Sequence, residues 1–502
     1  MKINKKQLVK GGVLTTLVVL SASVSALEKP QTMEDMWKII QAQQKQIDEM
    51  KSGMVAVPNK TPTSNIQNPE NKTATGNVQN PENKAATVNV QNPENKVAAS
   101  NVKNLERKTD ILSQEVEKLR TNLAIPEEAQ LKSAYGLGPA ASKVYQVGKG
   151  LSIGGYGEAF YQNFVSDQGI AKDNADFERM VLYVGYKFTD RILFNSELEF
   201  EHATTGEGDE EKGEVSVEFA SLDFFIDPLA NVRAGLVLMP MGMINRIHEP
   251  LFYFGNHRPV VDQKIIPTTW REIGVGLFGA ITPTLTYTAY VVNGLNAEGF
   301  SSDGIREGRG GGSQALAQNF GYVAQMNYEP ETLPGVTVGG SAYVGNSGQD
   351  QVFNGQKPNV FTQLYESHVQ WKYRGLEFRT LGSWGHINDA GILSAAAAAN
   401  GKGVIGSQNY GWYSEVGYDV LPLLFRDTPQ YLAPFFRYEK LNTIAKAPEG
   451  FAADPTQNQQ IFQVGLQYKP IPQVVIKADY RNFTAKQGNL PDDFNLGFGF
   501  IF

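Results

Sequence analysis

The sequence predicts an all-β chain, a sixteen-stranded antiparallel transmembrane β-barrel, preceded by short coiled-coil helices and a disordered repeat linker. Three observations predict the barrel. From about residue 150 onward, stretches of alternating apolar and polar residues are separated by turn-rich loops. These connections alternate between short and long, as in transmembrane barrels. The last strand carries Phe498, Phe500 and Phe502 on one face, which suits a wall that contacts lipid.

Residues 1–26 have the pattern of a secretory signal peptide. Lysines cluster at the start, an apolar stretch runs through Leu20, and Val24-Ser25-Ala26 forms a small-x-small cleavage pattern. A single anchoring helix is the alternative, but the apolar stretch is too short to span a bilayer comfortably. The pattern therefore predicts that the chain is exported.

Two segments after the cleavage site show the spacing of coiled-coil helices. Residues 27–52 place apolar residues three and four apart with a polar layer at Gln43, and residues 101–125 repeat this spacing. Isolated helices of this length are marginal in water, and parallel partners in a trimer would stabilise them. We therefore expect a homotrimer, with helices that lie against the barrel mouth as the alternative.

A twelve-residue repeat fills much of residues 53–100. The unit from Asn65 to Lys72 recurs from Asn77 to Lys84 and from Asn89 to Lys96. These units have too few apolar residues for a solenoid and each contains a proline, so they predict a disordered spacer in the periplasm. Residues 126–148 are expected to form a second linker, and residues 149–502 the barrel.

An even number of strands would place both ends of the barrel on the periplasmic side. The expected strands span residues 151–163, 177–188, 191–203, 214–226, 232–240, 270–280, 285–293, 319–328, 336–345, 360–373, 376–387, 409–420, 431–441, 460–469, 474–484 and 494–502.

The third long loop, residues 241–269, is the expected pore constriction. A barrel of this size leaves an aqueous lumen that side chains cannot fill. The run Phe252-Tyr253-Phe254 fits packing against the inner wall better than exposure. A loop that covers the barrel mouth is the alternative. The residues expected at the constriction are Arg246, His248, His257, Arg258 and Lys264.

Short motifs around this loop resemble the phosphate-selective porin O/P family. Pro240-Met241-Gly242 opens the loop, and residues 271–279 carry an Arg-x-x-Gly-Val-x-x-x-Gly motif at the start of the next strand. Asp190-Arg191, which opens the acidic third strand, also fits the pattern of this family. The resemblance covers about residues 148–502 and implies a trimeric barrel whose third loop lines the pore. The ending at Phe502 resembles the C-terminal signature of bacterial outer-membrane barrels, which implies an outer-membrane location and recognition by the barrel-insertion machinery.

Strand parity sorts the charged residues of the barrel into lumen-facing sets. With the more apolar face outward, the basic set is Lys187, Arg233, Arg379, Arg437, Lys477 and Arg481, and the acidic set is Glu197, Glu199, Glu201 and Glu218. An arginine ladder favours phosphate, whereas an acidic row repels anions. Three functions stay open: a porin for small hydrophilic solutes or small anions, a phosphate or oxyanion channel, and a tether between the outer membrane and the cell wall.

Other patterns argue against an enzyme, a cofactor or a nucleic-acid partner. The chain has no cysteine, and its five histidines show no metal-ligand spacing, so no metal site is expected. The GxGxxG match at residues 274–279 lies within a strand pattern and no helix follows it. The net charge of -7 comes without a dense basic patch.

Overall fold

The computed structural model describes residues 131–166, 169–204, 213–425 and 428–502. The predicted signal peptide, coiled-coil helices and repeat linker fall in residues 1–130, outside the described residues. In the described part of the chain, no helix is both long and apolar enough to cross a membrane.

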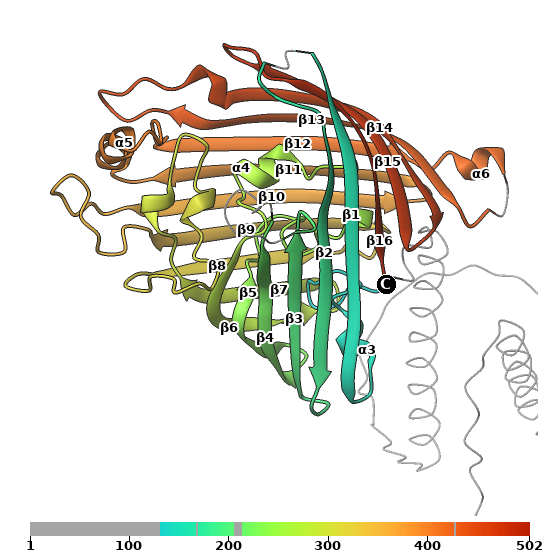
Figure 1. Cartoon of the computed structure of the whole chain (residues 1–502). Coiled ribbons are helices and arrows are strands. Elements are labelled where there is room, and N and C mark those ends of the chain that lie inside the picture. Colours follow the sequence, from blue (N-terminus) through green and yellow to red (C-terminus); the bar gives the residue numbers. More distant parts are fainter. Residues whose placement is uncertain (1–130, 167–168, 205–212, 426–427) are drawn as a thin grey trace, which may run out of the picture. The chain divides into compact units, whose positions relative to one another are not determined.

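The described strands form one closed antiparallel barrel, in which β1 pairs with β16 and every other pair is consecutive in the sequence (Figure 1). The predicted sixteen-stranded transmembrane barrel is confirmed. The strands are β1 (Gly150–Ser166), β2 (Asn174–Lys187), β3 (Ile192–Glu201), β4 (Val215–Asp227), β5 (Ala230–Leu238), β6 (Arg271–Thr282), β7 (Leu285–Asn293), β8 (Phe320–Tyr328), β9 (Val336–Asn346), β10 (Phe361–Tyr373), β11 (Leu376–Ile387), β12 (Gln408–Tyr418), β13 (Tyr431–Lys446), β14 (Asn458–Ile471), β15 (Val474–Ala485) and β16 (Asp492–Ile501).

Side chains alternate between the outer surface and the interior along the strands. In β16, Leu496 and Phe498 are exposed on the outer face, whereas the neighbouring Asn495 faces the interior and is buried. Phe502 is also exposed, and its backbone exchanges two hydrogen bonds with Gly155 where the barrel closes. Closure leaves the sheet with no open edge, which is the condition for a sheet to sit in hydrocarbon.

The connections follow the predicted alternation of short turns and long loops. The start of β1 and the end of β16 lie at the end of the barrel that carries the short turns. Toward the long-loop end, β13 continues to Lys446, five residues beyond the expected strand, because Gln408 of β12 pairs with Lys446. Residues 442–446 read Asn-Thr-Ile-Ala-Lys and lack the regular apolar–polar alternation, so the sequence pattern placed the end of the strand earlier.

Short helices lie in the loops and in the segment before β1. The longest, α5, contains an alanine run at residues 395–399. Alanine has the highest helix propensity, and Leu393 and Ala397 of α5 are buried. The helices are α3 (Lys143–Gln146), α4 (Val260–Lys264), α5 (Ala390–Ala399) and α6 (Leu421–Leu424), with the 3-10 turns η3 (Pro250–Phe252), η4 (Ala297–Gly299), η5 (Arg306–Gly308) and η6 (Pro455–Gln457).

Residues 131–148, which the sequence assigns to a linker, pack against the inner face of the barrel and are called the inner segment below. Its helix α3 lies next to β1 and β2 (Figure 1). The inward side chain of Asn195 donates from Nδ2 to the carbonyl oxygen of Ala141 at 2.9 Å. The Tyr145 hydroxyl donates to Asp223 Oδ2 at 2.8 Å, and Lys187 Nζ donates to the carbonyl oxygen of Val147 at 3.1 Å. The inner segment is therefore fixed to β2, β3 and β4 from inside.

Candidate functional site: loop 3 and the barrel interior

Loop 3, residues 241–269 between β5 and β6, lies inside the barrel and not over its mouth. Its apolar side chains are buried against inward residues of strands on several sides, and α4 lies next to β12 and β13 (Figure 1). The Phe254 ring stacks on Phe435 at 5.0 Å between ring centroids. The Tyr253 hydroxyl donates to Glu158 Oε2 at 2.7 Å. The aromatic run thus packs on the inner wall, as its composition predicts.

Basic residues of β13, β14 and β15 bind the backbone of loop 3. Arg437 Nη2 donates to the carbonyl oxygen of Phe254 at 2.6 Å. Lys477 Nζ donates to the carbonyl oxygen of Gly255 at 2.8 Å, and Lys469 Nζ donates to that of Leu251 at 3.1 Å. These ammonium and guanidinium groups satisfy buried carbonyl oxygens of an irregular segment, which is otherwise costly to bury.

The predicted basic set faces the interior, but its members already have partners. Arg233 Nε donates to Asp223 Oδ1 at 2.7 Å, and Arg481 Nε donates to Asp493 Oδ1 at 2.8 Å. Glu415 accepts from both Arg379 and Arg437, each at 2.8 Å. With Lys187 and Lys477 bound to carbonyl oxygens, the six side chains hold the inner segment, loop 3 and the wall together. They do not form a ladder of free cations.

The predicted acidic set lies on the wall formed by β3 and β4. Glu197, Glu199 and Glu218 are buried, whereas Glu201 is half-buried at the long-loop end of β3. Arg179 of β2 binds Glu158 at 2.9 Å and Glu199 at 3.0 Å. Arg271 at the start of β6 pairs with Glu218. Sequence reasoning missed Arg179 and Arg271 as partners, because strand register decides which residues meet.

Three of the five predicted constriction residues, Arg246, His248 and Arg258, are buried within loop 3, and His257 is half-buried. His248 and Arg258 lie beside the acidic wall. Both side chains are close enough to the Glu199 carboxyl to interact with it electrostatically. His257 Nε2 contacts Asn495 Oδ1 at 3.2 Å, and burial lowers its pKa. The fifth, Lys264, is partly exposed and binds Asp303 at 2.9 Å. The structure therefore does not gather the five residues at one ring.

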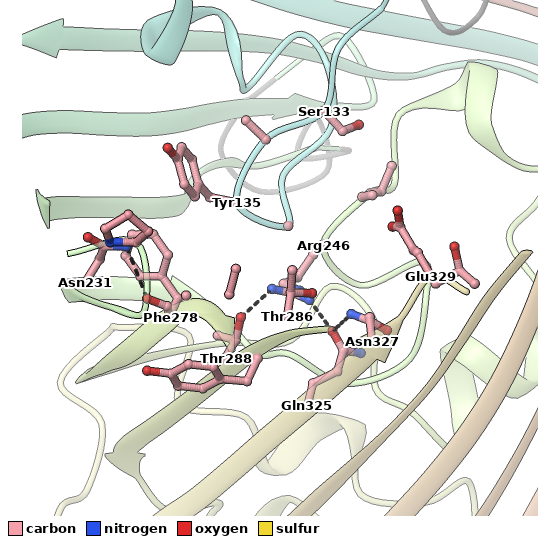
Figure 2. A pocket seen from close by; sticks show the side chains of 18 of the residues that line it. Ser133, Tyr135, Asn231, Arg246, Phe278, Thr286, Thr288, Gln325, Asn327 and Glu329 are labelled. Carbon is pink, nitrogen blue, oxygen red and sulfur yellow. Dashed lines mark hydrogen bonds between the residues drawn. The ribbon is translucent and has the colours of Figure 1, made fainter. Parts of the chain in front are cut away.

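Arg246 lies at a cavity of about 910 Å³ near the short-turn end of the barrel (Figure 2). Its guanidinium donates to Thr288 Oγ1 at 3.1 Å and to Gln325, and no described carboxylate forms an ion pair with it. Burial lowers the pKa of Arg246 to about 10, so it is a cation at neutral pH. The inner segment covers it closely: a Cβ on Gly136, whose φ is +80°, would lie 2.1 Å from Nη1.

The comparisons with known proteins identify one relative by sequence. No protein-family model matches the chain. A protein of Aquifex aeolicus (strain VF5), described as an uncharacterized protein, is 38% identical over 372 residues, which are 72% of this chain and 82% of that protein. The chain belongs to the same family as this Aquifex aeolicus protein.

Solved structures with a similar fold have low sequence identity to the chain. The loop L8 deletion mutant of OmpT, an outer membrane protein of Vibrio cholerae, has a TM-score of 0.45 and 9% identity, covering 71% of this chain and 100% of that chain. Salmonella typhi OmpF in complex with daunomycin has a TM-score of 0.46 and 13% identity, covering 71% and 98%. The outer membrane channel DcaP of Acinetobacter baumannii has a TM-score of 0.43 and 13% identity, covering 70% and 97%.

Asp262 of α4 is expected to make the stability of the protein dependent on pH. Burial raises the pKa of this carboxyl to about 8, and Glu439 and Glu366 add repulsion. An unfolded aspartate ionises near pH 4, so between about pH 4 and pH 8 the folded state binds the extra proton and stability falls as pH rises. The expected loss is on the order of 5 kcal/mol, complete above the folded pKa.

The variant Asp262→Asn is expected to remove this pH dependence and to be more stable than the unchanged protein at pH 8. Unfolding by denaturant in detergent, at pH 5 and at pH 8, measures the difference. Asp350→Asn is the matched control, because Asp350 forms an exposed pair with Lys357 and contributes little. Equal slopes for the unchanged protein and Asp262→Asn would contradict the prediction.

Proposed function

We propose that the protein is an outer-membrane porin through which small hydrophilic solutes and ions diffuse passively, with loop 3 as its constriction. The observation that carries the proposal is a closed barrel with a long loop bound to its inner wall. A barrel of sixteen strands has a lumen wider than its wall side chains fill, and a loop inside narrows that lumen. Backbone carbonyls bound to Arg437, Lys469 and Lys477 hold the loop at a fixed depth.

The location and partners belong to the same proposal. The signal-peptide pattern at residues 1–26 supports export, and the aromatic residues Phe498, Phe500 and Phe502 support recognition by the barrel-insertion machinery. The apolar outer face supports contact with outer-membrane lipid. The heptad spacing supports a homotrimer with its N-terminal extension in the periplasm.

We propose weak ion selectivity, because the interior charges neutralise one another. Arg379, Arg437 and Glu415 form one such paired group, and Arg481 with Asp493 forms another. An oxyanion channel is the second candidate, and one observation favours it. Arg246 is a buried cation without a carboxylate partner among the described residues, and it borders the cavity in Figure 2.

Planar bilayers distinguish these functions. We expect the purified protein to form ohmic channels with a small reversal potential in a KCl gradient, and phosphate to leave the chloride current unchanged. A strongly anion-selective reversal potential, with block by low phosphate that Arg246→Gln abolishes, would support the oxyanion channel instead. The absence of any conductance would overturn both and favour the tether to the cell wall.

A further inference from the structure

Two carboxylates and an imidazole meet where loop 3 contacts the acidic wall. They are Glu197 of β3, Glu218 of β4 and His248 of loop 3, and one oxygen or nitrogen atom of each lies within 4.8 Å of the other two. All three side chains are buried. A register shift between β3 and β4 pairs Glu197 with Phe219 and Leu198 with Val217, so Glu218 is the extra residue of a bulge. The bulge lets both Glu218 and Phe219 face the interior.

The contact between His248 and Glu197 lacks a positive group. His248 Nδ1 lies 3.1 Å from the carbonyl oxygen of Asn245, which only accepts, so Nδ1 carries the hydrogen. Nε2, 3.1 Å from Glu197 Oε1, is then a bare acceptor whenever the imidazole is neutral. A neutral imidazole therefore leaves two acceptor atoms facing each other, and a cation between them would satisfy both.

The second oxygens of the two carboxylates also lack donors. Glu197 Oε2 and Glu218 Oε2 are buried and accept no hydrogen bond from the described residues. Buried carboxylate oxygens are normally hydrogen-bonded, paired with a cation or bound to a metal. Their orphaned state is independent of the acceptor conflict at His248, and both features call for a cation at the same place.

The arginines around the three residues bind other carboxylate oxygens. Arg179 pairs with Glu158 and Glu199, and Arg271 pairs with Glu218 through Oε1. These ion pairs leave Oε2 of Glu197 and Oε2 of Glu218 without a donor among the described residues.

We propose that Glu197, Glu218 and His248 bind one divalent transition-metal ion of the zinc class, with water as the fourth ligand. A neutral imidazole with carboxylate oxygens is a ligand set that zinc accepts. The hydrogen bond from Nδ1 to the carbonyl oxygen of Asn245 orients the ring, as backbone carbonyls behind ligand imidazoles do in metal sites. The ion joins loop 3 to β3 and β4. The ion therefore adds to the hydrogen bonds from Arg437, Lys469 and Lys477, which hold the other side of loop 3. This metal site does not depend on which solute passes through the pore.

Zinc retention by the full-length protein in detergent tests the site. After removal of metals with EDTA, equilibrium dialysis against zinc chloride in excess magnesium is expected to leave one tightly held zinc ion per chain. His248→Gln and Glu218→Gln are each expected to lose it. The matched control is His368→Gln, because His368 is also buried and contacts Glu366 at 2.5 Å and Asn327 at 3.0 Å, but the described residues offer it no second carboxylate in reach of a shared metal ion.

A spectroscopic measurement on the unchanged protein keeps the test decisive if a variant does not fold. Zinc X-ray absorption is expected to show one imidazole nitrogen and oxygen ligands at about 2.0–2.2 Å. A folded protein that retains no zinc would overturn the proposal and indicate that a proton fills the contact between Glu197 and His248. An oxygen-only shell, or retention by both variants, would overturn it by locating zinc elsewhere.

Discussion

Replacing Arg437 with leucine is expected to free one side of loop 3 and to raise the single-channel conductance several-fold. The guanidinium joins Glu415, Gln463 and the Phe254 carbonyl oxygen, all between 2.6 and 2.8 Å. Leucine fills part of the volume but leaves a buried carboxylate and a buried carbonyl oxygen without that partner. Removing one member of a buried ion pair costs about 3–5 kcal/mol. The loop contact is therefore expected to break before the barrel unfolds.

Bilayer recordings of Arg437→Leu give the conductance, and denaturant unfolding in detergent gives the stability. Arg481→Leu is the matched control, because Arg481 is a buried wall arginine paired with Asp493 but makes no hydrogen bond to the loop 3 backbone. We expect the control to lose stability while its conductance stays unchanged. Equal conductance in both variants would show that Arg437 does not hold the constriction.

The barrel was predictable because its signal is local. A strand alternates with a period of two, and short turns alternate with long loops, so sequence spacing alone locates most strands. The same parity assigned Arg379 and Arg437 to the lumen-facing basic set, and both side chains are buried inside the barrel next to Glu415. What it lacked was register: β11, β12 and β13 place these three side by side, with Arg379 opposite Glu415 and Glu415 opposite Arg437. Register follows from the closed sheet as a whole, so strand parity gave a basic set and an acidic set but not the ion pairs that their members form.

The candidate site was less predictable for the same reason. Glu197, Glu218 and His248 lie far apart in the sequence, and a bulge together with a folded-in loop brings them together. The inner segment carries no strand or helix periodicity; Ala140, Ala141 and Val144 are buried only because the barrel surrounds them. Contacts of this kind come from tertiary structure, and residue patterns do not encode them.

Deleting residues 27–148 is expected to widen the pore, whereas deleting residues 27–130 is expected to leave the conductance unchanged. The shorter deletion keeps the inner segment, and the longer one removes it. Glu249 of loop 3 then loses the backbone amide of Ala140, which donates to Oε1 at 3.0 Å. The Tyr145 hydroxyl, which donates to Asp223 and accepts from Arg233 Nη2 at 3.0 Å, is lost as well. The short-turn end of the lumen opens and the conductance rises several-fold.

A point variant separates displacement of the inner segment from its loss. Gly136→Val places a branched side chain at a φ of +80° and against the Arg246 guanidinium, so the segment must move away from the wall. We expect its conductance to lie between that of the unchanged protein and that of the longer deletion. Should both deletions conduct alike, the inner segment does not obstruct the lumen. If the shorter deletion is enough to abolish trimers while its pores stay intact, residues 27–130 serve assembly, and the barrel conducts without them.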